Sequence, residues 1–363
     1  MMLRRCVVAM IFMLSPPIAS AESLANFACT GEGAAKYETG LGSDVDDIVH
    51  VPSRLRSNMY SLKRRGWTYE YGDGAFTYRD KKRVTIRRGA SPLNMTAQFS
   101  HEIGHANYAY REDLSSRDAY IRRACTDEGH GLVENIVAHR SMQTCAAEHL
   151  GIVSAEPDVL LAKYEDMVQR PPVNIPEIGY MFCERNRVPT GETYLDYYGG
   201  WYDANYGRTF KEEPVVSDPV LWDQVNVLAR SGGRGGAALR AIWPMSAPAE
   251  GNALNVPPAG TWRGGAAKLS GTVAILSSEI RTDPDGNVVI AYADLGGRCV
   301  TRSEVQAHYP TIEITQIPRA HGPRSTVWSA FGEWGELMFT FEEDAPKCVG
   351  TISLDPQSQP DEA

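Results

Sequence analysis

Two histidines four residues apart, with a glutamate directly after the first, are the side chains in this sequence best suited to chemistry. His101, Glu102 and His105 lie in the segment FSHEIGHA, residues 99–106. On a helix, residues four apart share one face, so both imidazoles can bind one ion while Glu102 reaches a neighbouring water. Zinc favours neutral imidazole ligands and makes a bound water acidic enough for a carboxylate to take its proton. The pattern predicts a zinc site with Glu102 as general base.

This motif resembles that of the zincin metallopeptidases, which implies a zinc-dependent peptidase with a zincin-like fold. In that superfamily the motif helix lies beneath a sheet whose edge strand pairs with extended substrate, and the resemblance gives this role to Arg83–Arg87. The longer metzincin motif is not matched, because Tyr108 and Arg111 stand where its glycine and third histidine would be. The resemblance is therefore to the gluzincin type.

A gluzincin-like site takes its third ligand, a glutamate, from a second helix. The resemblance points to Glu128, because the fragment Asp127-Glu128-Gly129 is similar to the one around that ligand in some aminopeptidase-like members. His130 and Glu134 remain alternative ligands. Asp127 is a candidate for a carboxylate that orients a ligand histidine.

Tyrosines crowd the segment from Thr193 to Gly207, which also contains two adjacent glycines. They are Tyr194, Tyr197, Tyr198, Tyr202 and Tyr206. A phenol in such a segment can donate a hydrogen bond to negative charge that develops on a substrate oxygen, but it can equally pack as part of a surface. Composition singles out none of them.

The elements that must position these residues follow from the hydrophobic pattern. Alternating polar and apolar residues predict strands at 68–71, 75–78 and 83–87, and a helical period follows from Leu93 to Ala106. Two further helical stretches are expected, at 118–124 and 131–142. We therefore predict an α+β catalytic domain over residues 22–230.

Beyond that domain the composition changes. Glycine and proline are frequent between residues 231 and 259, which predicts a linker. Short β-branched or aromatic segments follow at 271–276, 288–292, 311–315 and 337–341. We expect a small all-β accessory domain, a sandwich or barrel over residues 260–356, and a disordered tail at 357–363. Its expected roles are substrate binding, localisation or covering the cleft.

The N-terminus has the features of a secretory signal peptide. Arg4 and Arg5 precede the apolar run Cys6–Leu14, and Ala19-Ser20-Ala21 is typical of a cleavage site. We predict that residues 1–21 are removed after Ala21 and that the mature protein is periplasmic or secreted.

Cysteine usage agrees with export. Of the seven cysteines, six remain when Cys6 leaves with the signal peptide, which allows up to three disulfides in an oxidising compartment. Cys299 and Cys348 stand alone in the C-terminal part and are expected to pair with each other. The pairing of Cys29, Cys125, Cys145 and Cys183 stays open.

The overall charge excludes one class of binding partner. A formal net charge of -9 leaves no basic surplus for binding nucleic acid, and no later segment approaches the roughly 20 apolar residues of a membrane span.

Peptide, protein or the peptide part of peptidoglycan are the expected substrates. Two alternatives are a zinc amidase or toxin that attacks the cell envelope, and a non-enzymatic binding or inhibitory protein with a structural or vestigial metal site. Glu102 argues against the latter, because a structural site needs no base.

Overall fold

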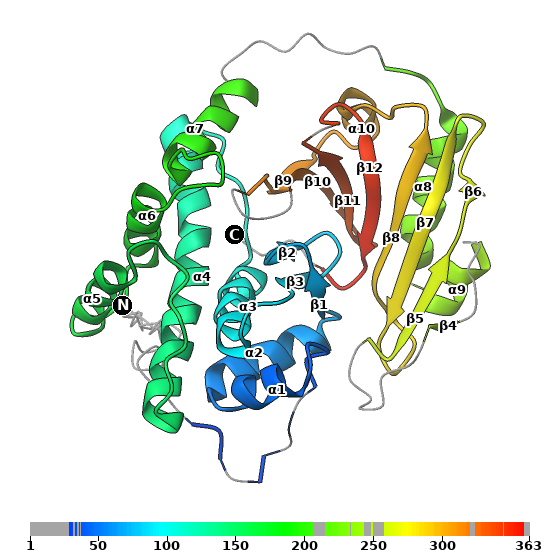
Figure 1. Ribbon diagram of the computed structural model, residues 1–363. Coiled ribbons are helices and arrows are strands. Elements are labelled where there is room, and N and C mark those ends of the chain that lie inside the picture. The colour runs from blue at the N-terminus through cyan, green and yellow to red at the C-terminus, as the bar shows by residue number, and fades with distance from the viewer. Residues whose placement is uncertain are drawn as a thin grey trace, which may run out of the picture.

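The computed structural model describes residues 29–358, except 32, 35, 37, 206–214, 233, 243–247, 250–257, 320–323 and 344. The predicted signal peptide, Tyr206 and the tail from residue 359 lie outside these residues. Two parts stand side by side in Figure 1, a helical part with a small sheet and a large antiparallel sheet with its own helices. The chain is therefore a mixed α+β protein, as predicted.

The helical part comes first in the chain. Its helices are α1 (Ser43–His50), α2 (Ser53–Arg64), α3 (Pro92–Asn107), α4 (Arg117–Ala146), α5 (Pro157–Val168), α6 (Ile175–Arg185) and α7 (Tyr194–Asn205). The motif segment lies in α3, which begins where the Ser91 side chain accepts a hydrogen bond from the backbone N–H of Asn94. α4 begins in the same way at Ser116, so local capping sets the start of both helices that carry the site.

The small sheet contains the three strands predicted for this part of the chain. They are β1 (Thr68–Gly72), β2 (Phe76–Tyr78) and β3 (Arg83–Arg87), in the order β1-β3-β2. The prediction that Arg83–Arg87 is the edge strand is therefore wrong. The short turn 79–82 makes β2 an antiparallel neighbour of β3, and β1 pairs in parallel with the other side of β3. β2 is the edge strand beside α3.

In the part of the chain that the structure describes, the large sheet has nine strands in a single sheet. They are β4 (Pro248–Ala249), β5 (Gly260–Gly264), β6 (Ala267–Lys268), β7 (Val273–Thr282), β8 (Val288–Gly297), β9 (Glu313–Gln316), β10 (Ser325–Gly332), β11 (Gly335–Glu342) and β12 (Val349–Asp355). Their order is β4-β5-β7-β8-β12-β11-β10-β9, with β6 paired to β7. Within the described residues, β4 and β9 end this path and do not pair, so the expected sandwich or barrel is wrong.

Helices take the place of a second sheet. α8 (Pro219–Gly232), α9 (Gly236–Ile242) and α10 (Arg302–His308) supply side chains to the core on one face of the sheet. Trp222 and Leu239 are buried there against strand residues such as Phe339. Residues 219–242 therefore belong with the sheet, although we expected them in the catalytic domain and linker. Glycine content suggested a linker, but α9 begins at Gly236, and its Leu239 joins this core.

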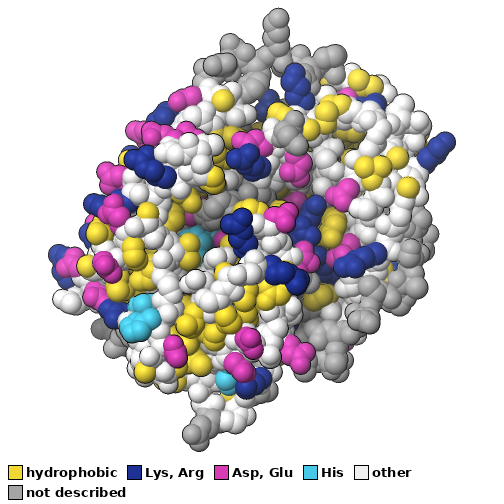
Figure 2. Space-filling model, viewed as in Figure 1, with side chains coloured by type: hydrophobic (Ala, Val, Ile, Leu, Met, Phe, Trp, Pro, Cys, Tyr) yellow, Lys and Arg dark blue, Asp and Glu magenta, His cyan; other side chains and the backbone are white. Residues whose placement is uncertain are grey.

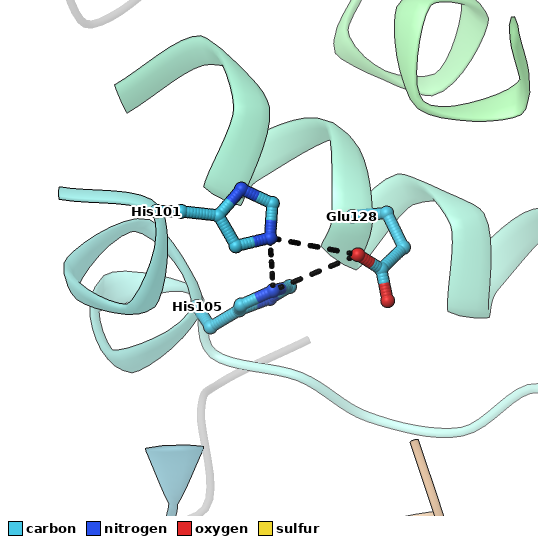
Figure 3. Close-up of side chains that lie close together, drawn as sticks. All are labelled: His101, His105 and Glu128. Atoms are coloured by element: carbon cyan, nitrogen blue, oxygen red, sulfur yellow. Dashed lines mark hydrogen bonds and ion pairs between the residues drawn. The ribbon is translucent and has the colours of Figure 1, made fainter. Parts of the chain in front are cut away.

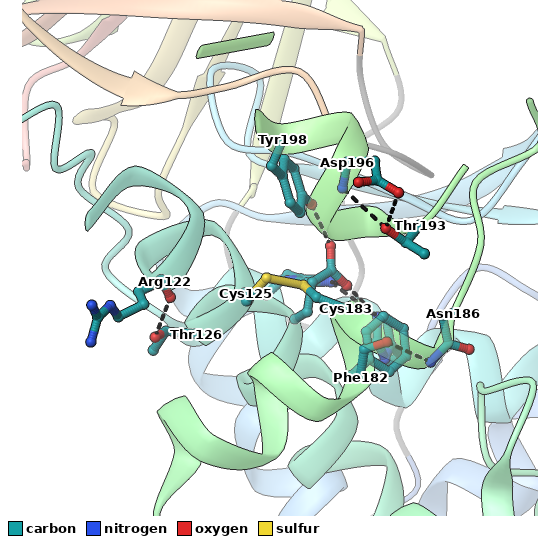
Figure 4. The surroundings of a disulfide bond; sticks show 12 residues. Arg122, Cys125, Thr126, Phe182, Cys183, Asn186, Thr193, Asp196 and Tyr198 are labelled. Carbon is teal, nitrogen blue, oxygen red and sulfur yellow. Dashed lines mark hydrogen bonds and ion pairs between the residues drawn. A yellow bond between two sulfur atoms is a disulfide. The ribbon is translucent and has the colours of Figure 1, made fainter. Parts of the chain in front are cut away.

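Three disulfides pair all six of the remaining cysteines. The expected bond between Cys299 and Cys348 is confirmed, and the others join Cys29 to Cys145 and Cys125 to Cys183. The last of these links α4 to α6 three residues before Glu128 (Figure 4). Three disulfides fit an oxidising compartment. Among the described helices, none is long and apolar enough to cross a membrane.

We expect the bond between Cys125 and Cys183 to be a major source of stability, since it closes a sequence separation of 58 residues. Replacing both cysteines by serine should lower the free energy of unfolding by about 2–5 kcal/mol. Urea unfolding followed by circular dichroism measures this change. In excess dithiothreitol the wild type and the variant should unfold at nearly the same urea concentration. An unchanged midpoint under oxidising conditions would contradict the prediction.

Candidate metal centre

The close approach of α3 and α4 places the predicted site residues together. A Cβ atom at Gly104 on α3 would lie 2.4 Å from the carbonyl oxygen of His130, and one at Gly131 on α4 would lie 2.8 Å from Cε1 of His101. Real side chains do not tolerate such distances, so both helices need glycine at this contact. The motif face of α3 is thereby brought directly against α4.

Three ligand atoms converge where these helices meet (Figure 3). Nε2 of His101 and Nε2 of His105 are 3.1 Å apart, and each lies 3.7 Å from Oε2 of Glu128. Ligand atoms around a tetrahedral zinc ion are about 3.3 Å apart, given bonds of about 2.05 Å. The three side chains are at most 1% exposed. This group therefore has the donor types and spacing to hold a metal ion.

The two alternative third ligands point elsewhere. His130 stacks on Tyr108, with the ring centroids 4.0 Å apart. Glu134 accepts hydrogen bonds from Arg54 and Asn58 on α2, each at 2.9 Å. Residues two and six positions after Glu128 lie on other sides of a helix with 3.6 residues per turn. In the described part of the chain, only His101, His105 and Glu128 form such a group.

Asp127 fixes the orientation of one histidine. Its Oδ1 atom lies 3.0 Å from Nδ1 of His105 and also accepts a hydrogen bond from Nη2 of Arg79 at 3.0 Å. Arg319 pairs with Oδ2 of the same carboxylate. Burial alone would raise the pKa of Asp127, but Arg79 and His105 outweigh it and lower that pKa to about 2. The ionised carboxylate holds the Nδ1 side of His105, which leaves Nε2 directed at the ligand group.

Glu128 is held by a tyrosine. The Tyr198 hydroxyl on α7 donates a hydrogen bond of 2.7 Å to Oε1 of Glu128, so Oε2 is the oxygen that faces the histidines. Burial and the Glu128 charge raise the pKa of Tyr198 well above its usual value, which keeps the phenol protonated. Tyr198 was one of five candidates for an oxyanion donor, but here it positions a ligand.

The other described tyrosines of that segment differ in their surroundings. Tyr197 and Tyr202 donate to the backbone oxygens of Arg319 and Leu114. Burial, followed by the charges of Glu128 and Glu102, raises the pKa of Tyr194 well above its usual value. Tyr194 therefore lies within the electrostatic reach of both carboxylates.

Glu102 is buried beside the ligands and held from the small sheet. The Thr77 hydroxyl on β2 donates to Oε2 of Glu102 at 2.7 Å. Burial raises the pKa of Glu102 to about 7, although His105 and Thr77 act in the opposite direction. A carboxyl group that titrates near neutrality can both take up and release a proton. Sequence reasoning missed Thr77 because nothing in its strand distinguishes it from other polar positions.

No protein-family model, curated protein or solved structure matches this chain. Its function must therefore be inferred from the chemistry of the candidate metal site. Two imidazoles and one carboxylate suit zinc, and three protein ligands leave the fourth tetrahedral position for water or substrate. The residues fit this metal both in type and in spacing.

A cavity of about 360 Å³ adjoins the site at the junction of the two parts. Its lining includes the basic side chains Arg65, Arg79, Lys82 and Arg111, and the aromatic side chains Trp67, Tyr108, Tyr110 and Phe331. Lys and Arg side chains gather around the middle of the face in Figure 2, where the two parts meet. None of the three ligands lines the cavity, but Arg79 lines it and also donates to the carbonyl oxygen of His105.

We expect Tyr198→Phe to weaken metal binding by about tenfold, because Glu128 loses the hydrogen bond that fixes its carboxylate. Competition with a chromophoric zinc chelator measures the affinity. Tyr202→Phe is the matched control, since Tyr202 lies on the same helix and donates to a distant backbone oxygen. Equal affinities for the two variants would show that Tyr198 does not position Glu128.

Proposed function

We propose that this protein is an exported zinc-dependent hydrolase that cleaves peptide bonds. The observation that carries the proposal is the buried group of His101, His105 and Glu128 with Glu102 beside it. Three protein ligands with a general base beside them are the arrangement of a catalytic zinc site. The resemblance of the motif to that of the zincin metallopeptidases supports the same reading.

In this proposal, each of a few side chains has one role in the reaction. Zinc in the site would supply Lewis-acid activation of a water molecule and of the substrate carbonyl. Glu102 takes the proton from the attacking water and passes it to the leaving amine, and Thr77 holds the carboxylate in place. Tyr194 offers its phenol to the negative charge that develops on the carbonyl oxygen. Tyr198 keeps Glu128 aligned as a ligand.

The substrate in this proposal is an extended peptide. β2 is the edge strand beside α3, so its outer edge takes the substrate-pairing role that we first gave to β3. The basic and aromatic cavity at the junction provides a surface for side chains away from the scissile bond. Protein, peptide and the peptide part of peptidoglycan all satisfy this description, and three disulfides favour a periplasmic or secreted setting.

One observation favours a second candidate, a non-enzymatic protein with a structural metal site. His105 and Glu128 are both 0% exposed, and a site shut off from solvent suits a structural metal better than one that must admit a substrate. The position of Glu102, one residue after His101, argues for the hydrolase, because a general base beside the ligands has no role in a structural site. The variant described next separates the two candidates.

We expect Glu102→Gln to keep the metal and lose turnover. Removing the base should lower kcat on casein by about 10²–10⁴-fold, because amide nitrogen and oxygen cannot carry the proton. Metal content by mass spectrometry should stay near one zinc ion per chain for the wild type and for the variant. Glu177→Gln is a matched control, because Glu177 is 47% exposed on α6 and pairs only with Lys163 among the described ion pairs.

The outcomes are distinct. Equal turnover of wild type and Glu102→Gln would reject Glu102 as the base. A wild type that binds zinc but cleaves neither casein nor peptidoglycan peptides would favour the structural candidate. A wild type that binds no metal in excess zinc would overturn the proposal.

A further inference from the structure

The large sheet reaches the metal centre directly through one arginine. Arg319 follows β9, and its guanidinium pairs with Oδ2 of Asp127, the carboxylate that holds His105. The two side chains are 2% and 4% exposed. Such a pair differs from a surface ion pair, because removing one partner leaves a buried charge without its counterion.

The segment that carries Arg319 is itself fixed to the helical part. Ile314 and Ile317 are buried in the core formed by α4, α6 and α7. The Tyr197 hydroxyl on α7 donates to the backbone oxygen of Arg319 at 3.5 Å. The Arg319 side chain therefore approaches Asp127 from a backbone that packs against the ligand-bearing helices.

The turn 79–82 makes a second connection between the sheet and the site. On its inner side, Nη2 of Arg79 donates to the carbonyl oxygen of His105 at 2.6 Å and to Oδ1 of Asp127 at 3.0 Å. On its outer side, Asp80 accepts from the Thr340 hydroxyl of β11 at 2.9 Å. The same turn continues from β2, the strand whose Thr77 holds Glu102.

Further contacts secure the outer side of this turn. Lys82 donates to the carbonyl oxygen of Val289 at 2.9 Å and pairs with Asp355 at 2.7 Å. Nη1 of Arg281 on β7 donates to the backbone oxygens of Lys81 and Lys82. The turn is thus held between the sheet and the metal centre, and a shift of the sheet would move Arg79.

We propose that the large sheet is a component of the metal centre, with Arg319 as a positioning residue that acts on His105 through Asp127. Arg79 pairs with Oδ1 of Asp127 and Arg319 pairs with Oδ2, so each part of the chain supplies one arginine to this carboxylate. Without Arg319, the described contacts that hold the carboxylate are those of Arg79 and His105, and the carboxylate can rotate away from Nδ1 of His105. This proposal rests on the metal site of the proposed function and adds a role for the sheet beyond an accessory one.

The test compares metal binding by variants of the full mature chain. Arg319→Gln should weaken zinc affinity by about 10–100-fold in competition with a chromophoric chelator. It should also change the visible spectrum of the Co²⁺-substituted protein, since His105 would take a different orientation. Arg319→Lys keeps the charge and should recover part of the affinity. Arg263→Gln is the control, because Arg263 pairs with Glu279 on the same sheet and is 70% exposed.

Near-ultraviolet circular dichroism of the metal-free variants establishes that they are folded. A folded Arg319→Gln variant with wild-type affinity and an unchanged Co²⁺ spectrum would overturn this inference and leave the hydrolase proposal intact. If Arg319→Gln does not fold, the zinc affinity of Arg319→Lys is the test of the inference. A weaker affinity then supports the inference, and a wild-type affinity overturns it. A wild type that binds neither zinc nor Co²⁺ overturns both proposals.

Discussion

The crossing of α3 and α4 is the contact on which the candidate metal site depends. Gly104 and Gly131 let the two backbones approach so closely that the histidines of one helix meet the glutamate of the other. A single methyl group at either position would displace backbone or the His101 ring. The distance between the helices therefore sets the distance between ligand atoms, and the side chains around them refine their orientation. The disulfide between α4 and α6 holds the second helix from its other side.

The buried carboxylates of the site need hydrogen-bond donors or cations beside them. These partners come from separate helices and strands. Glu102 is held by Thr77 on β2, Glu128 by Tyr198 on α7, and Asp127 by Arg79 and Arg319. An ionised group in a low-dielectric site is costly unless it is paired and hydrogen-bonded. The site is therefore complete only when helices, small sheet and large sheet are assembled, which explains why its supporting residues are scattered through the chain.

The sequence predicted mainly what lies within one element, and it predicted less well which distant elements meet. His101 and His105 share a helical turn, and the strands of the small sheet follow a period of two, so local spacing revealed both. Glu128 came from a resemblance to known motifs. Arg319 leaves no local pattern, because its partner Asp127 lies far away in the chain. The order of the small sheet and the single layer of the large one depend on pairing partners, which alternation within a strand does not specify.

The two faces of the large sheet explain why helices, and not a second sheet, complete it. One face is apolar and is covered by α8, α9 and α10. The other buries Arg281, Thr340 and Asp355, which need hydrogen-bond partners that an apolar layer does not supply. The turn 79–82 supplies them through its charged side chains and backbone oxygens. Because each polar group has a particular partner, this interface fixes one relative position of the two parts, whereas an apolar contact would allow them to slide. Arg79 and Arg319 can therefore hold Asp127 in a defined geometry.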